Sequence, residues 1–365
     1  MRVLVVNAGS SSLKLTLLDG DDQVIAAREL DVRGELNEAA VRDALSAGLD
    51  AADAVGHRIV HGGEQFVAAV RVDAEVEAAL RALTDLAPLH QPKSLAALDA
   101  VSAQLPNLPV VACFDTAFHA NMPAAAATYA LPAAWRERWP IRRYGFHGLS
   151  HSWVARQAPQ MLKHPPGSLR LVSCHLGAGA SLCAIADGRS VDTTMGFTPL
   201  EGLVMATRSG SVDPGLLLWL LEHTGMAVGE LASALEHDSG LKGLAGCEDM
   251  RVVLARADEG DAASALALDV WEHRLRGLIA GMAAAMGGLD ALVFTGGIGE
   301  RSAPIRARAV NGLAFLGLAI DAERNQTGDG DRELTADGAL ARTLVIQARE
   351  DLEIARQTRT VLASG

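Results

Sequence analysis

MRVLVVNAGSSSLKLTLL, residues 1–18, has a near-echo in RLVSCHLGAGASLCAIA, residues 170–186. Each copy contains an apolar strand, a turn of small residues and a second strand, and an Asp-Gly pair follows each copy, at residues 19–20 and 187–188. A shift of 168 residues superimposes the two pairs. Turns of small residues expose backbone N–H groups that bind anions, so the repeat predicts two related half-molecules with phosphate in a cleft between two domains.

The composition limits the classes of protein that the chain can belong to. Its 365 residues allow two domains with separate cores. Hydrophobic residues make up 49% and aromatic residues 4%, with 36 glycines, which is typical of an α/β protein rich in Ala, Leu and Val. A net charge of −12 disfavours a nucleic-acid-binding surface. The long apolar stretch at residues 265–286 contains Glu272, Arg274 and Arg276, which argues against a membrane span.

The N-terminus and the cysteines predict a cytoplasmic location. Arg2 precedes only a short apolar run, which is not the pattern of a signal peptide. The four cysteines form no CxxC pair, and Cys113, Cys174 and Cys183 lie in apolar or strand-like runs, where small buried hydrophobes are expected. We therefore expect a reducing compartment.

Hydrophobic periodicity predicts an α/β chain in which the order of elements repeats. The first half is expected to hold strands at residues 3–6, 13–18, 23–30, 54–60 and 110–114, and helices at residues 38–49, 74–85 and 94–104. The second half is expected to hold strands at residues 169–174, 181–185, 189–192, 291–294 and 343–347, and helices near 214–222, at 262–286, from 302 and at 351–362. Three strands followed by alternating helix and strand is a ribonuclease-H-like order. We expect two such domains with an active-site cleft between them.

Three turns that follow apolar strands are candidates for binding phosphate. In the turn at residues 7–14, Gly9 allows close backbone approach, three serines add hydroxyl donors, and Lys14 supplies a point charge. The second is the turn at residues 175–179, and the third, at residues 295–300, leads into a helix whose N-terminus favours anions. Each turn alone is also compatible with a purely structural role, such as a polar hairpin with a solvated lysine.

Four further residues carry charge or hydrogen-bonding groups at strand ends or in Gly-rich loops. Arg58 and Arg208 stand close to glycines, where a guanidinium commonly clamps an anion, although a surface ion pair is an equal alternative. Asp115 follows a strand, which places it at the mouth of an α/β cleft or at a helix cap. His147 lies between Gly and aromatic residues; a metal site with His151 lacks a supporting Cys or Asp. Walker A, GxGxxG and GxSxG motifs are absent.

Six motifs together resemble the acetate kinase family, and the resemblance extends from residue 1 to about residue 361. They are VNAGSSSLK at residues 6–14, GHRIVHGGE at 56–64, LAPLH at 86–90, FDTAFH at 114–119, YGFHG at 144–148 and MGFTPLEG at 195–202. The resemblance implies the superfamily of acetate and sugar kinases, heat-shock chaperones and actin, in which two ribonuclease-H-like domains close over ATP. Here we expect residues 1–117 with 350–365 in one domain and residues 118–349 in the other, nucleotide-binding, domain.

The resemblance also implies a reaction and its site. The reaction is the reversible, Mg²⁺-dependent transfer of phosphate from ATP to acetate, giving acetyl phosphate and ADP, in a homodimeric enzyme. The catalytic residues implied are Arg58, Asp115, His147 and Arg208; those around the substrate are Arg58, Val60, Leu89, Phe146 and Pro199; those at the metal are Asn7 and Glu350. The nucleotide contacts implied are Ser10, Ser12, Lys14, His175, Leu176, Gly177, Ala178, Gly179, Asp249, Met250, Arg251, Gly297, Ile298, Gly299, Glu300 and Arg301.

The chemistry of such a transfer fits these residue types. A carboxylate nucleophile is already anionic and needs no base, so the protein must align two anions and neutralise the charge that develops between them. Arginines, a histidine and Mg²⁺ supply charge or hydrogen bonds for that purpose. We expect Asp115 to orient an arginine or a metal-bound water.

Three departures from the family's pattern keep alternatives open. Ala178 stands where the family usually has Asn, Arg301 replaces another Asn, and residues 347–351 read QARED in place of the usual PTNEE. The alternatives are a propionate or other short-chain acyl kinase, a relative that uses pyrophosphate, and an ATP-binding, chaperone-like module. Val60 narrows the pocket and favours acetate.

Overall fold

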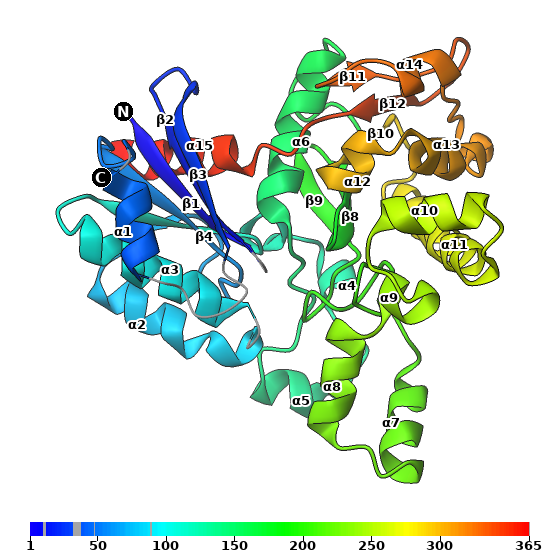
Figure 1. The fold of residues 1–365 in the computed structure, drawn as a ribbon, viewed down its shortest axis with the longest axis horizontal. Helices are drawn as coiled ribbons and strands as arrows, with labels where there is room; N and C mark the ends of the chain where they lie inside the picture. Colours follow the sequence, from blue (N-terminus) through cyan, green and yellow to red (C-terminus); the bar gives the residue numbers. More distant parts are fainter. Residues whose placement is uncertain (10–11, 32–37, 47, 88–89, 365) are drawn as a thin grey trace.

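Two six-stranded sheets with the same topology form the framework of the protein (Figure 1). The computed structural model describes residues 1–9, 12–31, 38–46, 48–87 and 90–364. Ser10 and Leu89, which the sequence assigns to the nucleotide and substrate sites, therefore lie outside the described residues.

The first sheet is built from the N-terminal third of the chain. Its order is β3-β2-β1-β4-β6-β5, with β1 at Val3–Ala8, β2 at Ser12–Leu18, β3 at Val24–Asp31, β4 at Ala54–Ile59, β5 at Val70–Arg71 and β6 at Val110–Phe114. Strands β1, β2 and β3 form an antiparallel meander, β1, β4 and β6 run parallel, and β5 pairs antiparallel with β6.

The second sheet repeats this arrangement strand for strand. Its order is β9-β8-β7-β10-β12-β11, with β7 at Leu171–Leu176, β8 at Ala180–Ala186, β9 at Arg189–Thr193, β10 at Ala291–Thr295, β11 at Arg332–Glu333 and β12 at Arg342–Val345. The meander, the parallel pairs and the antiparallel edge recur. The expectation of two halves with one strand order is confirmed.

Helices cover both faces of each sheet. On the first sheet, α1 (Glu38–Ser46) and α3 (Gln91–Gln104) pack on one face and α15 (Glu350–Ala363) on the other. On the second sheet, α11 (Ala262–Ala285) packs on one face and α6 (Gly148–Met161) on the other. Helices α6 and α15 contact each other between the two sheets. The boundaries of the two domains remain a prediction.

The remaining helices of the described residues have at most ten residues each. They are α2 (Ala74–Ala82), α4 (Ala124–Ala127), α5 (Ala133–Arg138), α7 (Pro214–His223), α8 (Val228–His237), α9 (Gly240–Ala245), α10 (Met250–Asp258), α12 (Gly296–Arg301), α13 (Ala303–Asn311) and α14 (Ala322–Gln326), with 3₁₀ turns at Thr84–Leu86, Ala117–His119 and Ala314–Leu316. Among the described residues, none of these helices nor the longer ones has the length and apolarity needed to cross a bilayer.

Several expected boundaries need correction. Strand β7 continues through His175 and Leu176, so the second turn begins at Gly177, because these two residues pair with β8. The helix expected at residues 74–85 stops at Ala82 and is followed by a 3₁₀ turn. Helix α6 was not expected at all. The helix contains Pro159 and begins with four polar or small residues in its first turn and a half. These residue types have low helix propensity, so the sequence does not show a helical pattern there.

A buried carboxylate links the last helix to α6. Glu353 of α15 is fully buried and accepts hydrogen bonds from Ser152 and Gln357. It also pairs with Arg156 of α6 and with Arg356, at N–O distances of 2.9 and 2.6 Å. Because removing one partner of a buried ion pair leaves a charge uncompensated, this cluster fixes how α15 lies against α6.

We predict that His57 makes the stability of the fold depend on pH. His57 of β4 is buried, its Nε2 has no partner among the described residues, and burial lowers its pKa to about 3. Below pH 6.5 the unfolded chain binds a proton that the folded chain excludes, so stability falls as pH falls. When the pH is lowered from 7 to 5, the unfolding free energy of the native chain should fall by about 2 kcal/mol more than that of the variant His57→Leu.

Urea unfolding at a series of pH values measures this difference. Equal pH dependence in the two proteins would show that His57 titrates alike in the folded and unfolded states.

Candidate active site

Residues at or just beyond the carboxyl ends of parallel strands from both sheets line a cleft of about 620 Å³. Asn7 comes from β1, Arg58 from β4 and Asp115 from the residue after β6, while His175 comes from β7 and Gly296 follows β10. Ligands of α/β sheets bind at this end of the strands. Both halves of the repeat therefore contribute to one cleft.

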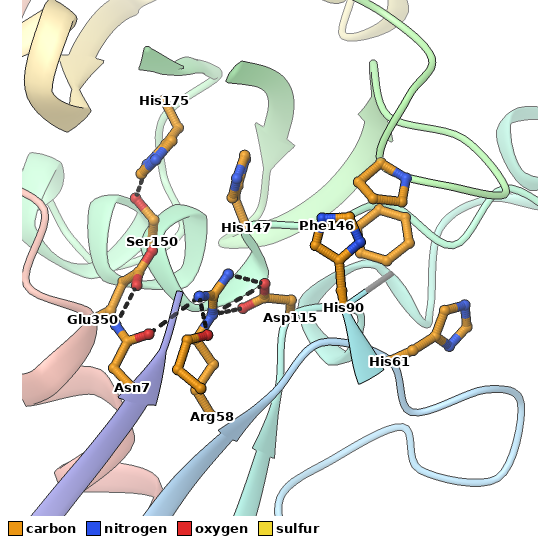
Figure 2. A network of polar contacts seen from close by, with 12 residues as sticks. Asn7, Arg58, His61, His90, Asp115, Phe146, His147, Ser150, His175 and Glu350 are labelled. Atoms are coloured by element: carbon orange, nitrogen blue, oxygen red, sulfur yellow. Dashed lines mark hydrogen bonds and ion pairs between the residues drawn. The ribbon is translucent and has the colours of Figure 1, made fainter. Parts of the chain in front are cut away.

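Four side chains from distant segments form a continuous array in this cleft (Figure 2). Arg58 donates two hydrogen bonds to the Asp115 carboxylate, at 3.0 Å from Nε to Oδ1 and 2.6 Å from Nη2 to Oδ2. Its Nη1 donates to Oδ1 of Asn7 at 3.1 Å and to the Ala8 carbonyl at 3.3 Å. Asn7 in turn donates from Nδ2 to Oε2 of Glu350 at 2.9 Å. These contacts use four of the five N–H groups of Arg58, so one N–H group remains for a ligand.

Burial and mutual attraction set the charges of this array. Burial alone disfavours the charged form of Arg58, but the negative charges of Asp115 and Glu350 outweigh it and raise its pKa. Burial would raise the pKa of Glu350, but the charge of Arg58 and the hydrogen bond from Asn7 outweigh it and lower that pKa. Arg58 and Glu350 therefore stay charged together.

Two donors from the second half converge at Gly179, in the turn between β7 and β8. A Cβ atom added to Gly179 would lie 3.4 Å from Nε2 of His147 and 3.6 Å from Nη1 of Arg208. Arg208 is held by its ion pair with Glu236 at 3.2 Å and by a hydrogen bond to the Pro199 carbonyl at 3.1 Å. The missing side chain of Gly179 thus leaves room for a group that both donors can contact.

The surroundings of His147 keep its ring neutral and fixed. The residue has a left-handed backbone with φ of 56° just before α6, a conformation that non-glycine residues seldom adopt outside functional sites. Its ring stacks on His175 at 4.4 Å and its Nδ1 lies 3.0 Å from Oγ of Ser181. Burial and the nearby His175, Arg58 and Arg208 lower the pKa of His147 well below 6.5. His147 can therefore act as a hydrogen-bond donor without carrying charge.

Apolar residues line the same cleft. Of the expected substrate pocket, Val60, Phe146 and Pro199 line it. His90 also lines it, with Nε2 at 3.3 Å from Nη2 of Arg208, and the sequence reasoning gave this histidine no role. Its place in the LAPLH motif was the only signal. Ser181, which contacts His147, was missed for lack of any signal.

The expected nucleotide residues fall into two groups. Those that line the cleft are Ser12, Lys14, His175, Gly177, Ala178, Gly179, Gly297, Glu300 and Arg301. Those that do not line it are Leu176, Asp249, Met250, Arg251, Ile298 and Gly299. Asp249 caps α10 and pairs with Arg251 at 2.5 Å, so its carboxylate is engaged within its own helix. The roles of all these residues remain predictions.

The donor set suits Mg²⁺ that arrives with a phosphate ligand. Mg²⁺ usually keeps several waters and is held by one or two carboxylates together with substrate phosphates. Glu350 uses Oε2 for Asn7, and its Oε1 has no hydrogen-bond partner in the described parts of the chain. The oxygen of Asn7 is already an acceptor for Arg58. The described residues contain no group of three or more His, Cys, Asp or Glu placed to hold a metal.

Comparisons with known proteins agree over nearly the whole chain. The model of the acetokinase family matches residues 32–356. An acetate kinase of Leifsonia xyli is 45% identical, with 100% of this chain and 99% of that protein covered.

Solved structures give the same result. The crystal structure of Porphyromonas gingivalis acetate kinase has a TM-score of 0.90 and 34% identity, covering 99% of each chain. A propionate kinase from Francisella tularensis has a TM-score of 0.91 and 35% identity, again covering 99% of each. The match of family, sequence and architecture is continuous across both sheets and the cleft between them. The chain belongs to the acetokinase family.

Proposed function

We propose that the protein is an acetate kinase, which transfers the terminal phosphoryl group of ATP to a carboxylate oxygen of acetate and gives acetyl phosphate and ADP reversibly. The observation that carries the proposal is the convergence of His147 Nε2 and Arg208 Nη1 at Gly179, in the cleft that also holds Arg58 and Asp115. A transferring phosphoryl group needs donors from several sides, and a module that only binds ATP needs no such clamp. We also propose a cytoplasmic location, where ATP is available.

Each group has a task in direct, in-line transfer. Acetate needs no general base because its carboxylate is already the nucleophile. The remaining N–H of Arg58 contacts an oxygen of acetate or of acetyl phosphate, and Asp115 keeps the guanidinium in place. His147 and Arg208 donate to the equatorial oxygens of the transferred group, where charge builds up. Glu350 would hold Mg²⁺, which would supply charge neutralisation at the phosphates of ATP.

Acetate is the acceptor that the pocket favours over propionate. Val60, Phe146 and Pro199 line the cleft, and they are the residues that the family resemblance implies around the methyl group of acetate. The solved structure of a propionate kinase is as similar to this chain as that of an acetate kinase, although the sequence relative at 45% identity is an acetate kinase, so propionate is the competing substrate to test. One methylene group is worth about 1–3 kcal/mol of discrimination.

The activity test is a hydroxylamine trap for acyl phosphate. The purified protein with Mg²⁺ and ATP should form acetyl hydroxamate, and kcat/KM for acetate should exceed that for propionate by roughly 10–200-fold. Butyrate should react more slowly still. Pyrophosphate in place of ATP tests the donor, because Ala178 and Arg301 depart from the family's pattern in the cleft. No hydroxamate with any acid and either donor would refute the proposal.

We predict that Asp115 supports activity by holding the guanidinium of Arg58 in position. The variant Asp115→Asn keeps the size of the side chain but removes the charge that holds the guanidinium. It should lower kcat/KM for acetate by roughly 10²–10³, the usual cost of disturbing one stabilising donor. Asp53→Asn is the control, because Asp53 also binds an arginine, Arg2, through two oxygens but at an exposed site.

The control should stay within about twofold of the native enzyme, since an exposed ion pair contributes little. Equal activities of Asp115→Asn and the native enzyme would remove Arg58 orientation from the mechanism.

We further propose a homodimer that buries α7. This helix, PGLLLWLLEH, has no buried residue although most of it is apolar, and Figure 1 shows it away from both sheets. Leu218 and Trp219 are 60% and 52% exposed, and Leu216 is 47% exposed. An apolar helix left this open is typical of an interface, and a second copy is the partner that the family resemblance implies.

Light scattering after size exclusion tests this state. The native protein should have twice the chain mass of 38.1 kDa. Leu218→Asp should shift it to the single-chain mass because a charge would be buried in the interface. Leu340→Asp, at a residue 89% exposed elsewhere, should remain dimeric. A native protein of single-chain mass at micromolar concentration would contradict the proposal.

A further inference from the structure

Behind His147 lies a line of buried polar side chains that leads away from the cleft. Nδ1 of His147 lies 3.0 Å from Oγ of Ser181 in β8, and the same Oγ lies 2.8 Å from Nε2 of His151 in α6. Nδ1 of His151 lies 2.9 Å from Oγ of Ser173 in β7. Ser173, Ser181 and His151 have no solvent exposure. Within the described residues, these side chains form hydrogen bonds only with one another, so the line is open only at Nε2 of His147, which faces the cleft.

The number of hydrogens allows two directions along this line. Ser181 has one hydroxyl hydrogen, so it donates to one of its two histidine neighbours and accepts from the other. Both histidines are neutral, since burial and the neighbouring charged or ring groups (His119 and His175 for His151, and His175, Arg58, His151 and Arg208 for His147) lower their pKa values well below 6.5. Each ring therefore carries one N–H, and fixing one hydrogen fixes them all.

The far end of the line distinguishes the two directions. The contact with His151 is the only hydrogen bond of the Ser173 side chain in the described parts of the chain. If His151 Nδ1 carried the hydrogen, the hydroxyl hydrogen of Ser173 would be buried without an acceptor, which costs about 1–3 kcal/mol. If Ser173 donates instead, its hydrogen is satisfied. Ser173 then donates to His151, His151 to Ser181, and Ser181 to His147.

The near end of the line favours the same direction. With Nδ1 of His147 as an acceptor, its hydrogen sits on Nε2, the atom that faces the space at Gly179 beside Arg208. The opposite direction would present a lone pair there, which repels an anion. His119 and Ser190 form a second pair in which a serine donates to Nδ1 of a histidine that carries its hydrogen on Nε2. His119 lies 3.1 Å from the Phe146 carbonyl, which can only accept, so Ser190 must donate to its other nitrogen at 2.8 Å.

We infer that Ser181 and His151 are positioning residues: the one-way line Ser173, His151, Ser181, His147 holds His147 as the Nε2–H tautomer and presents that hydrogen to the transferred phosphoryl group. The tautomer follows from the hydrogen bond at Ser173 without reference to any ligand, whereas its catalytic use rests on the proposed function. Hydrogen-bond partners that orient a functional histidine commonly change activity roughly 10–100-fold when removed.

The tautomer is measured first, on the native full-length protein. Long-range ¹H–¹⁵N spectra of histidine side chains distinguish a hydrogen on Nε2 from one on Nδ1. The signal of His147 is assigned by its loss in His147→Asn, a residue that tolerates the left-handed backbone found there. His147 and His151 should both carry hydrogen on Nε2. Hydrogen on Nδ1 of His147 would overturn the inference, whether or not any other variant folds.

The catalytic role is measured with Ser181→Ala. Its kcat should fall roughly 10–100-fold while KM for acetate and for ATP stays within about twofold, and Nδ1–H should appear at His147. Thr335→Val is the control, because it removes another buried hydroxyl that bonds to Thr343 N–H, outside the cleft lining. It should lose thermal stability but keep its kcat.

The outcomes separate the two proposals. A normal kcat in Ser181→Ala, or a lower kcat with the Nε2–H tautomer unchanged, would overturn the positioning role. If the native enzyme makes no acyl phosphate, the function fails, and the spectra still decide whether the line runs in the stated direction.

Discussion

The ion pair of Arg58 with Asp115 is the constraint around which the rest of the cleft is arranged. Burial of this guanidinium is offset by its hydrogen-bond partners, which come from β1 (Asn7 and the Ala8 carbonyl) and from the residue after β6, and Asn7 connects them to the first residue of α15. These places are adjacent only if β1, β4 and β6 lie parallel and side by side and if the C-terminal helix returns to the first sheet. The topology thus serves to assemble one charged array.

The duplicated sheets contribute to the cleft in different ways. Asn7 and His175 occupy equivalent positions, each the fifth residue of the first strand of its sheet. On the neighbouring strand, however, Arg58 in the first sheet corresponds to Thr295 in the second, whose buried hydroxyl has no partner in the described parts of the chain. The first half therefore supplies fixed charges, and the second half supplies neutral rings, an open glycine turn and Arg208. The two related halves therefore form one site with two chemically distinct sides.

The sequence predicted the positions of the strands better than it predicted which side chains contact one another in the site. Alternating apolar residues and the two small-residue turns were enough to place both meanders, because these depend on local pattern. Helix α6 was not predicted because it packs between two layers and its sequence shows no clear polar face. The pairing of Arg58 with Asp115, 57 residues apart, has no local signal, and neither has the contact of Ser181 with His147. Only the fold brings these residues together.

The histidines explain how so many cationic groups can share one cleft. Arg58 is neutralised by Asp115 and Arg208 by Glu236, while burial beside them keeps His147 and His175 uncharged. If these rings carried charge as well, the empty cleft would store a repulsion that only a bound anion could relieve. Neutral donors avoid that repulsion and still orient their hydrogens before substrate arrives. Stabilising a transferring phosphoryl group depends on such fixed dipoles, which need no reorganisation during the reaction.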